Sequence, residues 1–149
     1  MIKLGFKKVH PDAKLPEYAH VGDAGMDVFS VERATLTVGE PTLVKTGLVA
    51  EIPDGYELQV RPRSGLALKQ GITVWNSPGT IDSNYRGEIG VILLWTRRMD
   101  IEGRNWIEIP SGTKIAQLVL APVTKAQVVE VQDVSETDRG ERGFGSTGM

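Results

Sequence analysis

Glycine and proline divide this chain into short segments, and this punctuation restricts its fold more than any other feature. Seventeen Gly and eight Pro residues occur among 149 positions, a composition that argues against a bundle of long helices. Polar and apolar residues alternate in three of the intervening segments, as in strands with one buried face. These segments are residues 35–38, 56–60 and 106–109, with turn-forming sequences at residues 39–41, 53–55, 77–79 and 110–112. The pattern predicts an all-β sandwich or barrel.

The size and charge of the chain indicate one domain with no general attraction to polyanions. A length of 149 residues suits a single hydrophobic core. A net charge of −2 does not indicate binding to nucleic acid or to an anionic membrane. Cysteine is absent, which excludes a disulfide framework, a thiolate zinc site and a cysteine nucleophile. No segment approaches the ~20 apolar residues of a membrane helix. We therefore expect a cytosolic enzyme or binding module without a nucleic-acid or membrane partner.

Two segments are more apolar than simple alternation predicts, at residues 89–95 and 115–120. A strand that is apolar on both faces is covered on both, either within its own sandwich or by another subunit. Both interpretations stay open from these residues alone. The one helix that we expect is a turn or two over residues 66–70, ended by Gly71.

The last fifteen residues differ in kind from the rest, so we expect a folded domain over residues 1–134 and a flexible arm over residues 135–149. The arm is charged and then glycine-rich, and it carries one apolar side chain, Phe144, before the terminal Met. It cannot bury enough surface to fold alone. Its glycine pattern resembles a dinucleotide fingerprint, but the strand and helix that such a fingerprint needs are missing. Exposed N–H groups, hydroxyls and Arg139 can still wrap a phosphate, and a plain disordered tail is the alternative.

Two internal segments also carry candidate site residues. Arg63 and Ser64 follow an alternating strand and form a second possible phosphate-binding site. From these residues alone, however, a plain strand-to-helix turn with Ser64 as the N-cap of the short helix is the favoured explanation. Residues 75–82 have the composition of a tight hairpin. Within it Asn76 suits the edge of a pyrimidine, and Asp82 is either a base or a turn-forming residue. The two histidines, at positions 10 and 20, belong to no cluster, and we expect them at the surface.

Taken together and in order, five segments resemble the five motifs of the trimeric dUTPase family. They are residues 24–28, 62–67, 79–88, 112–118 and 139–148, and they extend over nearly the whole chain. The resemblance implies a jelly-roll β subunit that forms a homotrimer with active sites shared between chains. It also implies hydrolysis of dUTP to dUMP and pyrophosphate, with the C-terminal arm of one subunit closing over a site built by the other two.

The resemblance assigns roles to individual residues around the nucleoside. Asp82 is similar to the catalytic aspartate that deprotonates the water attacking the α-phosphorus. Asn76 and the backbone of Thr80 and Ile81 match positions that bind the uracil edge in a hairpin pocket. Gly90 matches a position whose backbone contacts the base. Tyr85 matches the tyrosine whose ring packs under the deoxyribose.

Other positions resemble the phosphate and metal contacts of the family. Asp27 is similar to the aspartate that helps to hold a hydrated Mg²⁺, through water. Phe144 would stack on uracil. The positions that resemble phosphate-binding groups are Arg63, Ser64, Gly65, Gln117, Arg139, Gly145, Ser146 and Thr147.

The chain departs from the family pattern at a few positions, and two other functions compete with the implied one. Lys114 stands where an arginine is common, which keeps the charge and loses the planar fork. The charged segment at residues 97–105 is longer than the usual connection. A related dCTP deaminase would need a glutamate about where Ile92 stands. A nucleotide-sensing protein on the same fold is the second alternative.

Overall fold

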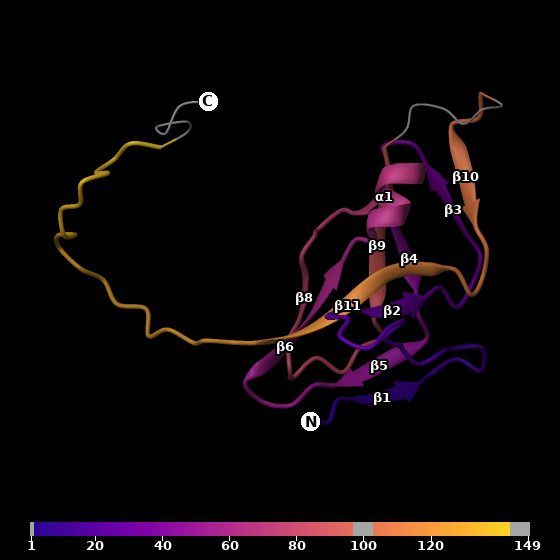
Figure 1. Cartoon of the computed structure of the whole chain (residues 1–149), viewed down its shortest axis with the longest axis horizontal. Helices are drawn as coiled ribbons and strands as arrows, with labels where there is room; N and C mark the ends of the chain where they lie inside the picture. The colour runs from indigo at the N-terminus through magenta and orange to yellow at the C-terminus, as the bar shows by residue number, and fades with distance from the viewer. Residues whose placement is uncertain (1, 97–102, 144–149) are drawn as a thin grey trace.

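A computed structural model describes residues 2–96 and 103–143 of the chain, and these residues form eleven strands and one helix (Figure 1). The all-β prediction is therefore confirmed. The elements in chain order are β1 (Gly5–Lys8), β2 (Met26–Phe29), β3 (Ala34–Thr37), β4 (Thr42–Lys45), β5 (Leu48–Glu51), β6 (Tyr56–Arg61), α1 (Ser64–Gln70), β7 (Ile72–Val74), β8 (Gly79–Ile81), β9 (Gly90–Trp95), β10 (Trp106–Ile109) and β11 (Lys114–Pro122).

The strands pair across long stretches of sequence, in the manner of a jelly-roll-like sandwich. One sheet has the order β2-β11-β6-β8 and another the order β4-β9-β7, while β1-β5 and β10-β3 form two-stranded sheets. All of these pairs are antiparallel. Apolar side chains from both larger sheets form one core, as expected for two sheets packed face to face. Its fully buried members include Val28, Leu58 and Leu118 from one sheet and Val44, Val91 and Leu93 from the other.

The sequence located the strands well, including the two unusually apolar ones. Residues 35–38, 56–60 and 106–109 coincide with β3, β6 and β10 to within one residue at either end. Both apolar segments are inner strands, because β9 lies between β4 and β7 and β11 lies between β2 and β6. Val91 and Leu93 of β9 face the core and Ile92 between them is half-buried, so coverage within the sandwich accounts for much of the apolar character.

The short helix ends as predicted but begins differently. Gly71 follows α1 with φ 69°, in the left-handed region, and its N–H bonds back to the carbonyl groups of Ala67 and Leu66. The expectation that Ser64 caps the N-terminus is wrong. Arg63 occupies the N-cap position with extended backbone and no side-chain cap bond, and Ser64 is already the first helical residue. Its hydroxyl is exposed and available for other contacts.

The predicted hairpin over residues 75–82 is also wrong, because its two arms belong to different sheets. β7 pairs with β9, and the Trp75 N–H continues that pairing to the carbonyl of Ile92 at 2.8 Å. β8 pairs instead with β6, with Thr80 opposite Gln59. The segment between β7 and β8 therefore carries the chain from one sheet to the other. Local turn composition favoured a hairpin, but pairing with distant strands decides the course of the backbone.

The tail leaves the domain at the end of β11. The Val123 N–H donates to the carbonyl of Gly55 at 2.8 Å, and residues 123–143 form no strand and are exposed. Figure 1 shows this part of the chain running away from the body. Its flexibility and the domain boundary at residue 134 stay predictions. His10 and His20 are exposed, as expected.

No helix in the described ranges is long and apolar enough to cross a membrane. The expected cytosolic location stays a prediction.

The turn between β4 and β5 depends on a glycine that accepts no side chain. Gly47 has φ 68°, and a Cβ there would lie 2.8 Å from the Cβ of His10 and 2.9 Å from that of Ala13. Gly39 offers a matched control, because its φ is 77° but nothing lies within 4 Å of the corresponding position.

We predict that Gly47→Ala lowers the free energy of unfolding far more than Gly39→Ala. The left-handed conformation costs about 1–2 kcal/mol at either position, and overpacking adds about 1–3 kcal/mol at Gly47 alone. Urea denaturation of both variants at one protein concentration measures the difference. Equal losses in the two variants would contradict the packing assigned to this turn.

Candidate functional site

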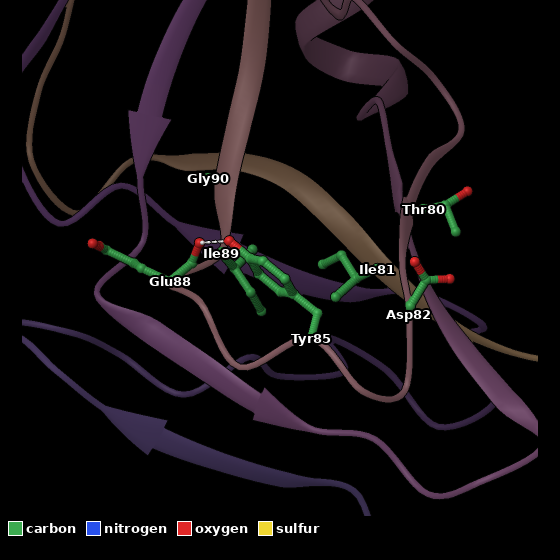
Figure 2. A pocket seen from close by; sticks show the side chains of 7 residues that line it. All are labelled: Thr80, Ile81, Asp82, Tyr85, Glu88, Ile89 and Gly90. Carbon is green, nitrogen blue, oxygen red and sulfur yellow. Dashed lines mark hydrogen bonds between the residues drawn. The ribbon is translucent and has the colours of Figure 1, made fainter.

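Asp82 lines a cavity of about 190 Å³, which we call the Asp82 pocket (Figure 2). The pocket forms where β8 ends, where the following loop turns back and where β9 begins. Ile81 and Ile89 are buried and fix its floor to the core, while Asp82 and Tyr85 are exposed. The complete lining is Thr80, Ile81, Asp82, Tyr85, Glu88, Ile89 and Gly90.

The Tyr85 ring is held over the loop that forms the pocket. Its hydroxyl donates to the carbonyl of Glu88 at 3.2 Å, and its N–H donates to the carbonyl of Asp82 at 3.1 Å. A Cβ on Gly87 would overlap the Tyr85 hydroxyl, so the ring can lie there only because residue 87 lacks a side chain. The loop thus presents an aromatic surface that is 47% exposed at one side of the pocket.

The Asp82 carboxylate accepts no hydrogen bond from the residues that the structure describes. It projects beside Thr80, away from the Tyr85 hydroxyl and the Glu88 carboxylate (Figure 2). The same two residues, Thr80 and Asp82, also line a larger open hollow of about 870 Å³ beside the start of the tail. An exposed carboxylate with free lone pairs can accept a proton or orient a water molecule.

A second cavity, of about 270 Å³, lies beside β2 and the start of α1, and we call it the Arg63 pocket. Strand register explains how its residues converge. Gln117 of β11 lies opposite Asp27 on one side and Arg61 on the other, and the chain reaches Arg63 two residues after Arg61. The complete lining is Ala19, Asp23, Gly25, Asp27, Arg63, Ser64, Gly65 and Gln117.

The Asp27 carboxylate joins two cations at the wall of this pocket. Arg63 Nε lies 2.9 Å from one oxygen and Lys114 Nζ lies 2.8 Å from the other, and Asp27 is only 14% exposed. Arg63 also donates to the backbone carbonyl of Lys114 at 3.2 Å. Glu17 contacts Lys114 Nζ at 3.3 Å. Asp27 thus holds the Arg63 guanidinium at the pocket by its Nε, and the other N–H groups of the guanidinium can donate to an anion.

The pKa of Lys114 is raised above its ordinary value by this arrangement. The hydrogen bond to Asp27 is the main cause and the hydrogen bond to Glu17 is the second. Lysine at this position departs from the usual family pattern, in which arginine is common. Its ammonium group reaches the Asp27 carboxylate as a point charge, so the loss of a planar fork does not prevent the ion pair.

The Gln117 side chain is fixed close to the backbone of the Arg63 pocket. Its amide nitrogen donates to the carbonyl of Pro62 at 2.9 Å. A Cβ on Gly25 would overlap the Gln117 amide, which explains why the residue directly before β2 is a glycine. The segment that precedes Arg63 is therefore tied to β11 by a side chain as well as by strand pairing.

The structure brings most of the predicted site residues together, but in two separate groups. Thr80, Ile81, Asp82, Tyr85 and Gly90 line the Asp82 pocket. The other group lines the Arg63 pocket and consists of Asp27, Arg63, Ser64, Gly65 and Gln117. No residue lines both pockets.

Several predicted residues lie outside both groups. Asn76 is exposed near Gly79 and lines neither pocket. Arg139 lies in the exposed tail, where its Nε donates to the carbonyl of Arg142 at 2.8 Å. Phe144, Gly145, Ser146 and Thr147 lie outside the described residues, as does most of the charged segment at residues 97–105.

The sequence analysis assigned no role to five residues that line the pockets, among them Ala19 and Gly25 in the Arg63 pocket. Glu88 and Ile89 line the Asp82 pocket, and Asp23 lines the Arg63 pocket. Glu88 is the last residue of the segment 79–88, which resembles a family motif. Its place in that motif was a sign that it could belong to the site. Asp23 directly precedes another such segment, but an exposed aspartate in a turn gives little sign of a site.

A divalent cation could be held only in part by the chain's own groups. Across residues 2–96 and 103–143, no three His, Asp or Glu side chains gather as a metal cage. Asp27 nevertheless fits a hydrated ion, because a carboxylate has about four lone-pair sites and two of them face Arg63 and Lys114. Magnesium retains several waters and binds substrate phosphates, so one carboxylate at the wall suffices as an outer contact.

Comparisons with known proteins identify the family of the chain. The family model for dUTPase matches residues 11–148. A deoxyuridine 5'-triphosphate nucleotidohydrolase of Alkaliphilus metalliredigens is 50% identical over 149 residues, which cover 100% of this chain and 99% of the relative.

Two solved phage structures have the same fold. A mutant dUTPase of Staphylococcus bacteriophage 80alpha, solved with dUpNHpp, aligns with a TM-score of 0.89 at 29% identity and covers 100% of both chains. A mutant dUTPase from phage phi11 of S. aureus aligns with a TM-score of 0.78 at 28% identity, over 89% of this chain and 98% of that one. The second structure is described as revealing the coordination of a structural Mg(II) ion.

We predict that Lys114→Gln reveals the ion pair through the pH dependence of stability. Because the pKa of Lys114 is raised on folding, its charged form stabilises the protein fully below the unfolded pKa, about 10.4, and the effect is lost as pH rises through the folded pKa. The melting temperature of the parent should therefore exceed that of Lys114→Gln by a constant amount from pH 7 to 9. The excess should shrink above about pH 10.4.

The control for this measurement is Lys3→Gln, at an exposed lysine that forms no ion pair within the described chain. It should leave the melting temperature close to that of the parent at each pH. A Lys114→Gln difference that persists unchanged at high pH would show that the ammonium charge is not the stabilising feature.

Proposed function

The chain belongs to the dUTPase family, and we propose that it hydrolyses dUTP to dUMP and pyrophosphate with Asp82 as the base. The observation that carries the proposal is the Asp82 pocket, where a free carboxylate lies beside an aromatic platform and exposed backbone. Hydrolysis at the α-phosphorus needs a water in line with the leaving group, an acceptor for its proton and neutralised phosphate charge.

Asp82 is suited to orient and deprotonate the attacking water. Its carboxylate is exposed, and no donor among the described residues occupies its lone pairs. The backbone that carries it is fixed, because the Asp82 carbonyl accepts from the Tyr85 N–H and Ile81 beside it is buried in β8. A positioned base of this kind typically contributes about 10²–10⁴-fold to a rate.

Backbone groups of β8 and β9 are suited to bind the uracil edge. β8 is an edge strand that pairs only with β6 in the described chain, so part of its N–H and C=O groups point away from the sheet. Thr80 and Ile81 therefore offer both donors and acceptors to a base. Gly90 would add a contact from β9, and Tyr85 would pack under the deoxyribose. Asn76 would supply the amide contact predicted for it from the segment that joins the sheets.

The Arg63 pocket is suited to hold the phosphates. Arg63, the Ser64 hydroxyl, Gly65 and Gln117 line a polar hollow in which the Arg63 guanidinium is held by Asp27. Arginine and backbone N–H groups are strong phosphate donors. The arm would complete the site, with Phe144 stacked on uracil and the remaining phosphate contacts made by Arg139, Gly145, Ser146 and Thr147.

Mg²⁺ is the cofactor that we propose. Asp27 would hold it through water at the wall of the Arg63 pocket, and the substrate phosphates would supply the inner ligands. When bound, the ion neutralises phosphate charge. The support from known proteins is the structural Mg(II) ion of the phage phi11 dUTPase.

A homotrimer with shared sites would explain how residues from two separate pockets act on one substrate. The base and the phosphate-binding groups line separate cavities of one chain, so one substrate would bridge them most directly if the two sets came from different subunits. The tail that carries Arg139 runs away from its own domain (Figure 1). We therefore propose that each site takes Asp82 from one copy, Arg63 from a second and the arm from a third.

The two alternative functions have less support. Deamination of dCTP would need a carboxylate about where Ile92 stands, and this half-buried aliphatic side chain of β9 cannot transfer a proton. A nucleotide sensor without activity would not need a free base in the pocket. Neither alternative accounts for Asp82 better than hydrolysis does.

We predict that Asp82→Asn lowers the turnover of dUTP by about 10²–10⁴-fold while binding persists. The amide keeps the shape of the side chain but cannot accept the proton of water. Pyrophosphate release measures turnover, and titration with the non-hydrolysable analogue dUpNHpp measures binding.

The matched control is Asp12→Asn, at an exposed aspartate that lines neither the pockets nor the hollow beside the tail. It should retain the parental rate. Parental turnover in Asp82→Asn would show that another group is the base, and the loss of dUpNHpp binding would show that Asp82 acts in substrate binding instead.

A further inference from the structure

Glu88 connects the Tyr85 platform to a buried turn elsewhere in the chain. Its backbone carbonyl accepts from the Tyr85 hydroxyl at 3.2 Å. Its carboxylate accepts from the backbone N–H of Gly47 at 2.9 Å, across 41 residues of sequence. The two ends of one residue therefore link the aromatic ring to the turn between β4 and β5.

The residue after Glu88 is bonded to the same turn. The Ile89 N–H donates to the Leu48 carbonyl at 2.7 Å. The Ile89 carbonyl accepts from the Thr46 N–H at 3.2 Å and from the Thr46 hydroxyl at 2.7 Å. With the bond from Gly47 to Glu88, four hydrogen bonds join residues 88–89 to residues 46–48.

The turn itself has little freedom to move. Thr46 is 1% exposed. Gly47 packs with no space for a side chain against His10, Ala13 and Val31, and its carbonyl accepts from the Val9 N–H at 2.8 Å. Buried backbone with several hydrogen bonds is a rigid support. A group bonded to this turn takes its position from the core and not from the exposed loop.

The Glu88 side chain does not take part in the chemistry of the pocket. Figure 2 shows its carboxylate directed away from Asp82 and Thr80. Glu88 is half-buried and belongs to no core cluster. Its removal would release the anchor without opening a cavity in the core, so its effect on the platform can be separated from an effect on folding.

We propose that Glu88 is a positioning residue that sets discrimination between deoxyribonucleotide and ribonucleotide substrates. This inference rests on the proposed function, in which the Tyr85 ring packs under the deoxyribose. An added 2′-hydroxyl is rejected by steric overlap only while the ring cannot retreat, and an apolar surface otherwise discriminates weakly against one hydroxyl. The hydrogen bonds from Gly47 to Glu88 and from Tyr85 to Glu88 prevent this movement of the ring.

The experiment compares kcat/KM for dUTP and UTP in the parent, Glu88→Ala and Glu88→Gln. Loss of one anchoring hydrogen bond should lower the dUTP-to-UTP ratio about three- to tenfold in Glu88→Ala. Glu88→Gln keeps an oxygen that accepts from the Gly47 N–H and should stay within about twofold of the parent. Glu40→Ala, at an exposed glutamate far from the pocket in sequence, should keep the parental ratio.

Tyr85→Phe provides a second and independent measurement. It removes the hydroxyl that donates to Glu88 and keeps the ring, so the ratio should fall by a similar factor. In the double variant with Glu88→Ala the ratio should fall no further than in the more affected single variant, because both changes break one connection. Additive losses would overturn the connection.

The outcomes separate this inference from the function on which it rests. A parent that does not hydrolyse dUTP would overturn the proposed function and this inference together. A parent that hydrolyses dUTP and UTP equally well would overturn the role of Tyr85 under the deoxyribose and this inference with it. A selective parent whose ratio is unchanged in Glu88→Ala would overturn the inference alone. Equal loss of activity on both substrates in Glu88→Ala would also overturn it, since that result indicates a structural role without specificity.

Discussion

The pairing of β11 with two neighbours is the constraint on which the rest of the molecule depends. β11 lies between β2 and β6, and Gln117 is opposite both Asp27 and Arg61. This register places Asp27, Lys114 and Arg63 within ion-pair distance, although they come from three distant segments. A shift of one residue would turn Gln117 to the other face and separate the charges. Backbone pairing therefore assembles the Arg63 pocket, and the ion pairs then fix its side chains.

The Asp82 pocket is built on a different principle, because its groups follow one another along the chain and gain rigidity from distant supports. Ile81 and Ile89 anchor the loop in the core, and residues 46–48 hold its far end through hydrogen bonds to the Ile89 backbone and the Glu88 carboxylate. A free carboxylate and an exposed ring can thus project from a short loop without losing their positions. The charged pocket suits phosphates and the backbone-lined pocket suits a base and sugar.

Local patterns predicted local features well and non-local features poorly. Alternation located β3, β6 and β10, and Gly71 marked the end of α1, because these signals act within a few residues. The hairpin at residues 75–82 was predicted wrongly, since pairing of β7 with β9 and of β8 with β6 outweighs turn composition. The residues of both pockets came mainly from the family resemblance. Glu88 received no role because its partner, Gly47, lies 41 positions away.

Hydrolysis by a composite site requires that Asp82 and Arg63 of different copies act on one dUTP molecule. The most direct measurement refolds Asp82→Asn chains together with Arg63→Gln chains and follows pyrophosphate release from dUTP with Mg²⁺. Each variant alone should be nearly inactive, and the mixture should regain activity, because some sites then combine an intact Asp82 with an intact Arg63. A mixture no more active than its components, with mixed oligomers present, would contradict a site shared between chains.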